Sequence, residues 1–119
     1  MSDVAGWVYE TKTGEISGTL KDQDGAVFTP DTITFSLYDL ETKSVINSRS
    51  SVSLTPVATY HNATTGKVTF NLTAADNAFV TAGNREEVHI ARFEFSWLTG
   101  ARTSMHEIPF VVRQKPDIV

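Results

Sequence analysis

Apolar residues recur at every second position along most of this chain of 119 residues. A period of two puts neighbouring side chains on opposite faces of an extended strand, whereas a helix needs a period near 3.6. The clearest case is residues 32–39, where Ile33, Phe35 and Leu37 alternate with Tyr38 and hydroxyl side chains. Such alternation is typical of antiparallel strands with one buried face. The chain is therefore predicted to be all-β.

Similar alternation predicts strands at residues 15–20, 67–72, 86–97 and 102–113. Shorter apolar runs predict weaker strands at residues 26–28 and 44–47. Residues 52–54 and 57–60 flank Pro56, which favours an edge strand or an irregular crossing there. The predicted core aromatic side chains are Phe35, Phe70, Phe93, Phe95, Trp97 and Phe110.

The last predicted strand, residues 102–113, has an inward face and an outward face. Its inward side chains are Ser104, His106, Ile108, Phe110 and Val112. Pro109 falls on the outward side, as it does on an edge strand, because proline cannot donate to a ladder.

Thr73 and Asp76 have the spacing of a helix-start capping box. This spacing predicts one or two helical turns within residues 73–80, before a break at Gly83. About seven short strands with two aromatic inner faces favour a two-sheet antiparallel sandwich of immunoglobulin-like type, and a small jelly roll is the alternative. The expected organisation is an N-terminal arm (1–14), the sandwich (15–113) and a C-terminal tail (114–119).

The charge balance bears on the class of partner. Fourteen acidic and ten basic side chains give a net charge of -4, and the basic residues are not clustered, which disfavours nucleic-acid binding. No apolar run has the length of about 20 residues that a membrane span needs. The first residues lack the pattern of a signal peptide, so we expect a cytosolic product that does not bind membranes. The absence of Cys excludes disulfides and thiol nucleophiles.

The histidines are the main candidates for catalytic or metal-binding residues. His89 and His106 both lie on inward positions of neighbouring predicted strands, near several glutamates, so a metal site with two His ligands and a carboxylate is conceivable. No His-x-Glu or His-x-x-x-His spacing supports it, and no Gly-x-Ser-x-Gly motif is present. We therefore expect a non-enzymatic protein without metal or cofactor, with these histidines in structural roles.

One segment favours a protein partner. Val4, Trp7, Val8 and Tyr9 form an apolar, aromatic cluster ahead of a polar hinge. Large aromatic side chains on a terminal arm need a surface to cover. The arm either adds an edge strand to its own sandwich or docks on a neighbouring chain. In the second case, deletion of residues 1–12 should leave the fold intact.

Several strings resemble a family of small tailed-bacteriophage virion proteins. They are residues 18–22, 33–39, 45–49, 76–80 and 89–97, followed by His106 and Glu107. The order of a Leu-Tyr-Asp strand, a Gly-Lys-Val-Thr-Phe strand and a Phe-Glu-Phe strand is also similar to the immunoglobulin-like N-terminal domain of phage baseplate upper proteins.

This resemblance implies a structural role as a capsid decoration (cement) protein that binds the outer capsid surface. It implies that the partner is the major capsid protein or another virion protein, and that the chain self-associates as a dimer or trimer. It also implies that the protein is part of the virion, which is assembled in the host cytoplasm. The alternative is a tail, baseplate or host-receptor-binding module that uses the loops at residues 39–43, 61–66 and 98–102. A metal-dependent enzyme that uses His89 and His106 is a third hypothesis.

Overall fold

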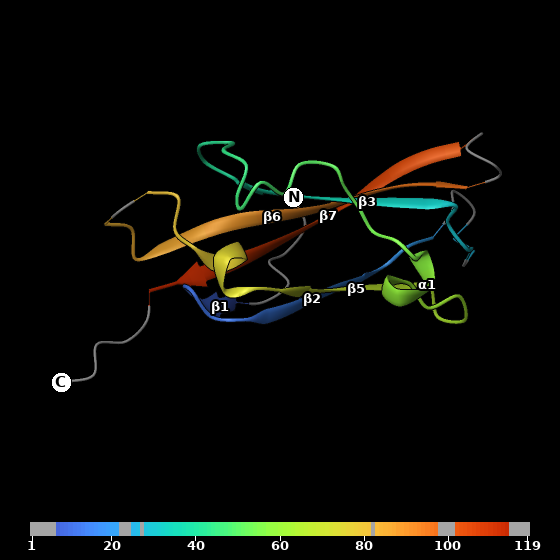
Figure 1. Ribbon diagram of the computed structural model, residues 1–119, viewed down its shortest axis with the longest axis horizontal. Helices are drawn as coiled ribbons and strands as arrows, with labels where there is room; N and C mark the ends of the chain where they lie inside the picture. The colour runs from blue at the N-terminus through green and yellow to red at the C-terminus, as the bar shows by residue number, and fades with distance from the viewer. Residues whose placement is uncertain (1–6, 22–24, 27, 82, 98–101, 115–119) are drawn as a thin grey trace.

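The computed structural model describes residues 7–21, 25–26, 28–81, 83–97 and 102–114, and this part of the chain folds into two stacked β layers (Figure 1). The prediction of an all-β protein is confirmed. In chain order the elements are β1 (Trp7–Tyr9), β2 (Gly14–Thr19), β3 (Thr32–Asp39), β4 (Val52–Ser53), α1 (Val57–Tyr60), β5 (Lys67–Leu72), the 3-10 helix η1 (Ala74–Asn77), β6 (Glu86–Trp97) and β7 (Arg102–Arg113).

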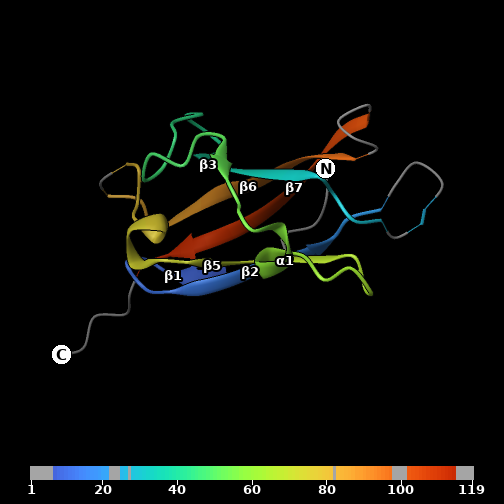
Figure 2. The same ribbon diagram turned by 45° about the vertical axis from the view of Figure 1, so that its right-hand side comes forward.

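The larger sheet has the strand order β1-β7-β6-β3-β4, and the smaller sheet pairs β2 with β5. All described pairings are antiparallel except that of β1 with β7, which is parallel. β6 and β7 pair along their full length, and in both views they run side by side as the longest strands (Figure 2). The molecule is elongated, with principal-axis extents of 53 × 27 × 24 Å.

The core lies between the two sheets. Phe35 of β3 stacks on Phe70 of β5 with ring centroids 4.1 Å apart, which joins the layers at their centre. Phe93 packs on the other side of Phe35 at 5.3 Å. Five of the six predicted core aromatic residues are buried, and the sixth, Trp97, is half-buried against Phe28.

Three weaker strand predictions are wrong. Residues 57–60 form the helical turn α1, in which the N–H of His61 donates to the carbonyl of Val57 at 2.9 Å. Residues 44–47 contribute only one bridge, between Val45 and Tyr38, because Asn47 adopts a positive φ that an extended strand does not allow. The described residues among 26–28 form no strand, and there Phe28 packs on Phe95 and Trp97.

The inward face of β7 is covered only in part. Ile108, Phe110 and Val112 are buried as predicted, whereas His106 is half-buried and Ser104 is exposed. The reason is length, because the strands of the smaller sheet have six residues and cannot cover strands of twelve.

The predicted helical turn is confirmed as η1, with Thr73 and Asp76 forming the capping box. Within the described chain, no helix is long and apolar enough to span a bilayer.

Candidate functional site

The predicted arm contributes an edge strand to the larger sheet. Trp7, Val8 and Tyr9 align in parallel with the last three residues of β7, and the N–H of Glu10 donates to the carbonyl of Arg113 at 2.8 Å. Val8 points inward, against the core, while Trp7 and Tyr9 point outward. Val4 lies outside the described residues. Of the two alternatives for the arm, residues 7–9 adopt the pairing within their own chain.

Trp7, Tyr9 and Arg113 form an exposed cluster, here called the aromatic patch. The two rings meet edge to face with centroids 4.8 Å apart, and the Arg113 guanidinium lies 4.8 Å from the Trp7 ring centre. Trp7 is 49% exposed and Tyr9 is 37% exposed. Tryptophan, tyrosine and arginine are the residues most enriched at the energetic centres of protein interfaces. The patch is therefore suited to contact another protein.

Arg113 was missed by sequence reasoning. It belongs to the patch only because β1 pairs with β7, a contact between opposite ends of the chain that no local pattern reveals. Its guanidinium also pairs with Glu86 at 3.4 Å, which holds it beside the rings.

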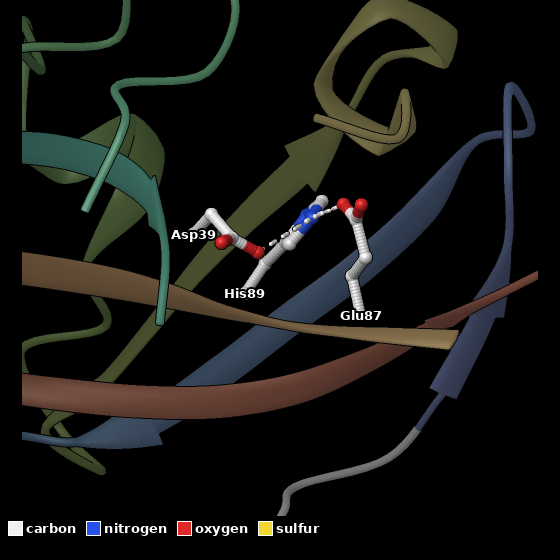
Figure 3. Close-up of side chains that lie close together, drawn as sticks. All are labelled: Asp39, Glu87 and His89. Atoms are coloured by element: carbon white, nitrogen blue, oxygen red, sulfur yellow. Dashed lines mark hydrogen bonds and ion pairs between the residues drawn. The ribbon is translucent and has the colours of Figure 1, made fainter. Parts of the chain in front are cut away.

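A second cluster is buried where β3 ends and β6 begins. Asp39 and His89 stand opposite each other in the sheet, and Glu87 lies two residues before His89 on the same face (Figure 3). The His89 Nε2 atom is 2.9 Å from Glu87 Oε1 and 3.8 Å from Asp39 Oδ1. All three side chains are almost fully buried.

Glu87 receives four hydrogen bonds. The N–H groups of Val80 and Thr81 donate to it at 2.8 and 2.9 Å, and the Asn84 amide and His89 imidazole donate at 2.9 Å. Burial alone would raise the pKa of Glu87, but these hydrogen bonds outweigh it and lower the pKa below its usual value. An ionised carboxylate with four donors is a poor proton acceptor, so the arrangement is suited to joining Val80, Thr81 and Asn84 to the sheet.

Asp39, Glu87 and His89 are also the group that could hold a metal ion, because their ligand atoms lie within 4.8 Å of one another. A metal would have to replace the bond from His89 to Glu87. In addition, His89 Nδ1 has no hydrogen-bond partner in the described chain, whereas metal-bound histidines donate their second N–H. The cluster fits a structural role better than a metal centre.

The predicted pairing of His89 with His106 does not form a site. His89 stands opposite Phe110 and His106 stands opposite Phe93, four positions further along the ladder. The imidazole of His106 instead covers Gly18 of β2, where an added Cβ would lie 2.7 Å from Nε2.

A depression of about 400 Å³ lies beside α1 and is lined by Tyr60, His61, Asn62, Lys67 and three threonines, among others. It includes part of the predicted 61–66 loop. Both nitrogen atoms of His61 are buried without a hydrogen-bond partner among the described residues. Residues 98–101 of the predicted 98–102 loop lie outside the described chain.

Comparisons with protein-family models, with curated proteins and with solved structures find no match to this chain.

Proposed function

We propose that the chain is a non-enzymatic structural protein of a tailed-phage virion, a capsid decoration protein that binds the outer capsid surface and stabilises the shell. The resemblance of its strands to small virion proteins supports the assignment to a phage virion. The aromatic patch carries the proposal, because it offers an exposed Trp-Tyr-Arg cluster on a rigid sheet edge.

We also propose that the sandwich is of immunoglobulin-like type. In that fold, strands B and E share one sheet, and strands C′, C, F and G follow one another in the other. Here β2 and β5 share one sheet, and β4, β3, β6 and β7 follow one another in the other, so the chain order supports the assignment. A rigid sandwich of this kind presents a fixed surface to a repeated partner.

The absence of an enzymatic role is supported by the state of the buried cluster. The carboxylate of Glu87 is saturated by four donors, and the His89 imidazole is completely buried. A substrate would have to break this network before meeting either group.

The net charge and the proposed oligomer also fit a position on the outer surface of a capsid shell. The net charge of -4 opposes contact with packaged DNA and favours the outer face of a capsid. The proposed partner is the major capsid protein or another virion protein, in a homo-oligomer that repeats the contact over the shell.

Co-sedimentation with shells assembled from the major capsid protein of the same phage tests this proposal. We expect saturable binding at a fixed ratio to capsid subunits, and loss of binding for the double variant Trp7→Ser, Tyr9→Ser. Thr11→Ser and Thr13→Ser, exposed positions next to β1, are the matched controls. Absence of binding by the wild-type protein would reject the decoration role.

A tail, baseplate or receptor-binding module is the second candidate. The depression beside α1 favours it, because Tyr60 and Lys67 meet there with the Asn62 amide and three threonine hydroxyl groups, a lining suited to a saccharide. Binding to host cell envelopes that survives Trp7→Ser, Tyr9→Ser but is lost with Lys67→Ala would favour this role over shell binding.

A further inference from the structure

Within the described residues, the first part of β7 has a strand partner on one side only. β6 pairs with all of β7, but in the described chain β1 covers only Val111, Val112 and Arg113 on the other side. An uncovered strand edge is a template for pairing with another chain. We propose that two copies of this protein join through this open edge of β7, forming one sheet that continues across a two-fold axis.

The direction of the backbone groups follows from the ladder with β6. The N–H of Gln114 donates to the carbonyl of Arg85 at 2.8 Å, one step beyond the pair of Glu86 and Arg113. Hydrogen-bonded pairs alternate with non-bonded pairs in an antiparallel ladder, so the even-numbered residues of β7 bond to β6. The odd-numbered residues therefore turn their N–H and C=O groups toward the open side.

The β1 side of the strand agrees with this assignment, because there the carbonyl of Arg113 accepts from the N–H of Glu10. On the uncovered part, Thr103, Met105 and Glu107 present both of their backbone groups. Pro109 also faces the open side but has no N–H to donate.

These backbone groups favour one register for a second copy, the one that pairs all three residues with one another. A two-fold axis perpendicular to the sheet pairs β7 with itself in antiparallel fashion and keeps the two faces of the sheet separate. With Met105 opposite Met105 of the second copy, Thr103 stands opposite Glu107, and every backbone group of these three residues finds a partner. A shift of two residues toward Pro109 would set a residue without N–H opposite Thr103.

The side chains fit the same register. Met105 is 55% exposed, the most exposed large apolar side chain in the described chain, and the axis brings its two copies together. Glu107 would face Thr103, and its charge is already paired with Arg92, whose Nε donates at 2.9 Å. Arg102 would face Ile108, so no like charges stand opposite each other. The self-complementary edge favours a second copy over an unrelated strand.

Charged substitutions of Met105 test the interface directly. We expect the wild-type protein to sediment as a monomer-dimer equilibrium, and Met105→Lys and Met105→Glu each to be monomeric at concentrations where the wild type is dimeric. An equimolar mixture of the two variants should recover the dimer, because Lys would then face Glu. Circular dichroism checks that both variants fold. A wild type that stays monomeric up to millimolar concentration overturns the proposal, and a mixture that fails to dimerise overturns the register.

Cross-linking supplies an independent readout, because the chain has no native Cys. We expect Met105→Cys to give a covalent dimer with a short bismaleimide. Val45→Cys is the matched control, since Val45 is 52% exposed but lies away from the β7 edge. Equal cross-linking of the two variants would indicate random collision and would contradict the interface. The dimer does not depend on the shell-binding role, so the two proposals can fail separately.

Discussion

Asp76 joins the loop after Ile46 to the start of η1 through one buried carboxylate. It accepts hydrogen bonds from the Asn47 amide at 2.8 Å, from Arg49 Nε at 2.9 Å and from the N–H of Thr73 at 2.8 Å. Burial would raise the pKa of Asp76, but the bonds from Arg49, Asn47 and Thr73 outweigh it and lower the pKa. The loop after Ile46 and the start of η1 therefore depend on this charge.

We expect Asp76→Asn to lower the free energy of unfolding by about 3 kcal/mol at neutral pH, because Arg49 loses its charged partner. The pKa of Asp76 is depressed in the folded state, so its stabilisation is complete above the unfolded value near 3.8 and is lost as the pH falls through the lower folded value. Urea unfolding over a pH series should show the difference between the proteins closing in acid. The exposed Glu15→Gln is the control, and a difference independent of pH would contradict the role of the charge.

His61 is a second group that makes the stability fall in acid, for a different reason. Its side chain is buried, neither nitrogen has a hydrogen-bond partner among the described residues, and burial lowers its pKa from the usual 6.5. Below that pH the unfolded chain binds a proton that the folded chain resists, so this group makes stability fall as the pH is lowered.

His61→Leu should therefore raise the free energy of unfolding by about 1 kcal/mol, because it removes an unsatisfied polar group. The gain should grow between pH 7 and pH 5 in chemical denaturation. His61→Gln, which keeps an unsatisfied polar group but does not titrate, should give no gain at pH 7 and should share only the part of the gain that grows toward pH 5. A destabilised His61→Leu would show that the imidazole has a partner in solution.

At the scale of elements, β1 belongs to the fold of its own chain. Besides its pairing with β7, the connection after it is fixed where the N–H of Thr11 donates to the carbonyl of Asn77 and the Asn77 amide donates to the carbonyl of Lys12. Deleting residues 1–12 should lower the free energy of unfolding by about 2–4 kcal/mol, since several hydrogen bonds are lost and Asn77 loses its acceptor.

Trp7→Ser, Tyr9→Ser keeps those backbone bonds and is the matched comparison for the deletion. It should change stability by less than about 1 kcal/mol, because the two rings are exposed. Thermal unfolding of the three proteins checks both expectations. A deletion variant as stable as the wild type would mean that the arm is bound only weakly to its own sheet.

Local patterns predicted the long strands because each has one buried and one solvated face, as in β3 and β5. They failed at α1, where Val57 and Tyr60 have the composition of a strand, and only the hydrogen bond from His61 N–H to Val57 reveals the turn. They also missed Asp39 as a neighbour of His89, because that contact depends on the register of two strands far apart in sequence.

At the scale of the whole molecule, the aromatic patch and the open part of the β7 edge lie on the same border of the larger sheet. A two-fold dimer would carry two patches, one from each copy. Two patches on one rigid body would bridge neighbouring capsid subunits and raise the effective affinity of each contact.

The thermal rupture temperature of capsid shells shows whether the protein stabilises a shell through its aromatic patch. We expect saturating wild-type protein to raise the rupture temperature, and the same concentration of Trp7→Ser, Tyr9→Ser to leave it unchanged. Met105→Lys should give an intermediate rise, because each copy would bind through one patch without bridging. Shells unaffected by the wild-type protein, or stabilised equally by the patch variant, would rule out the proposed decoration role of the patch.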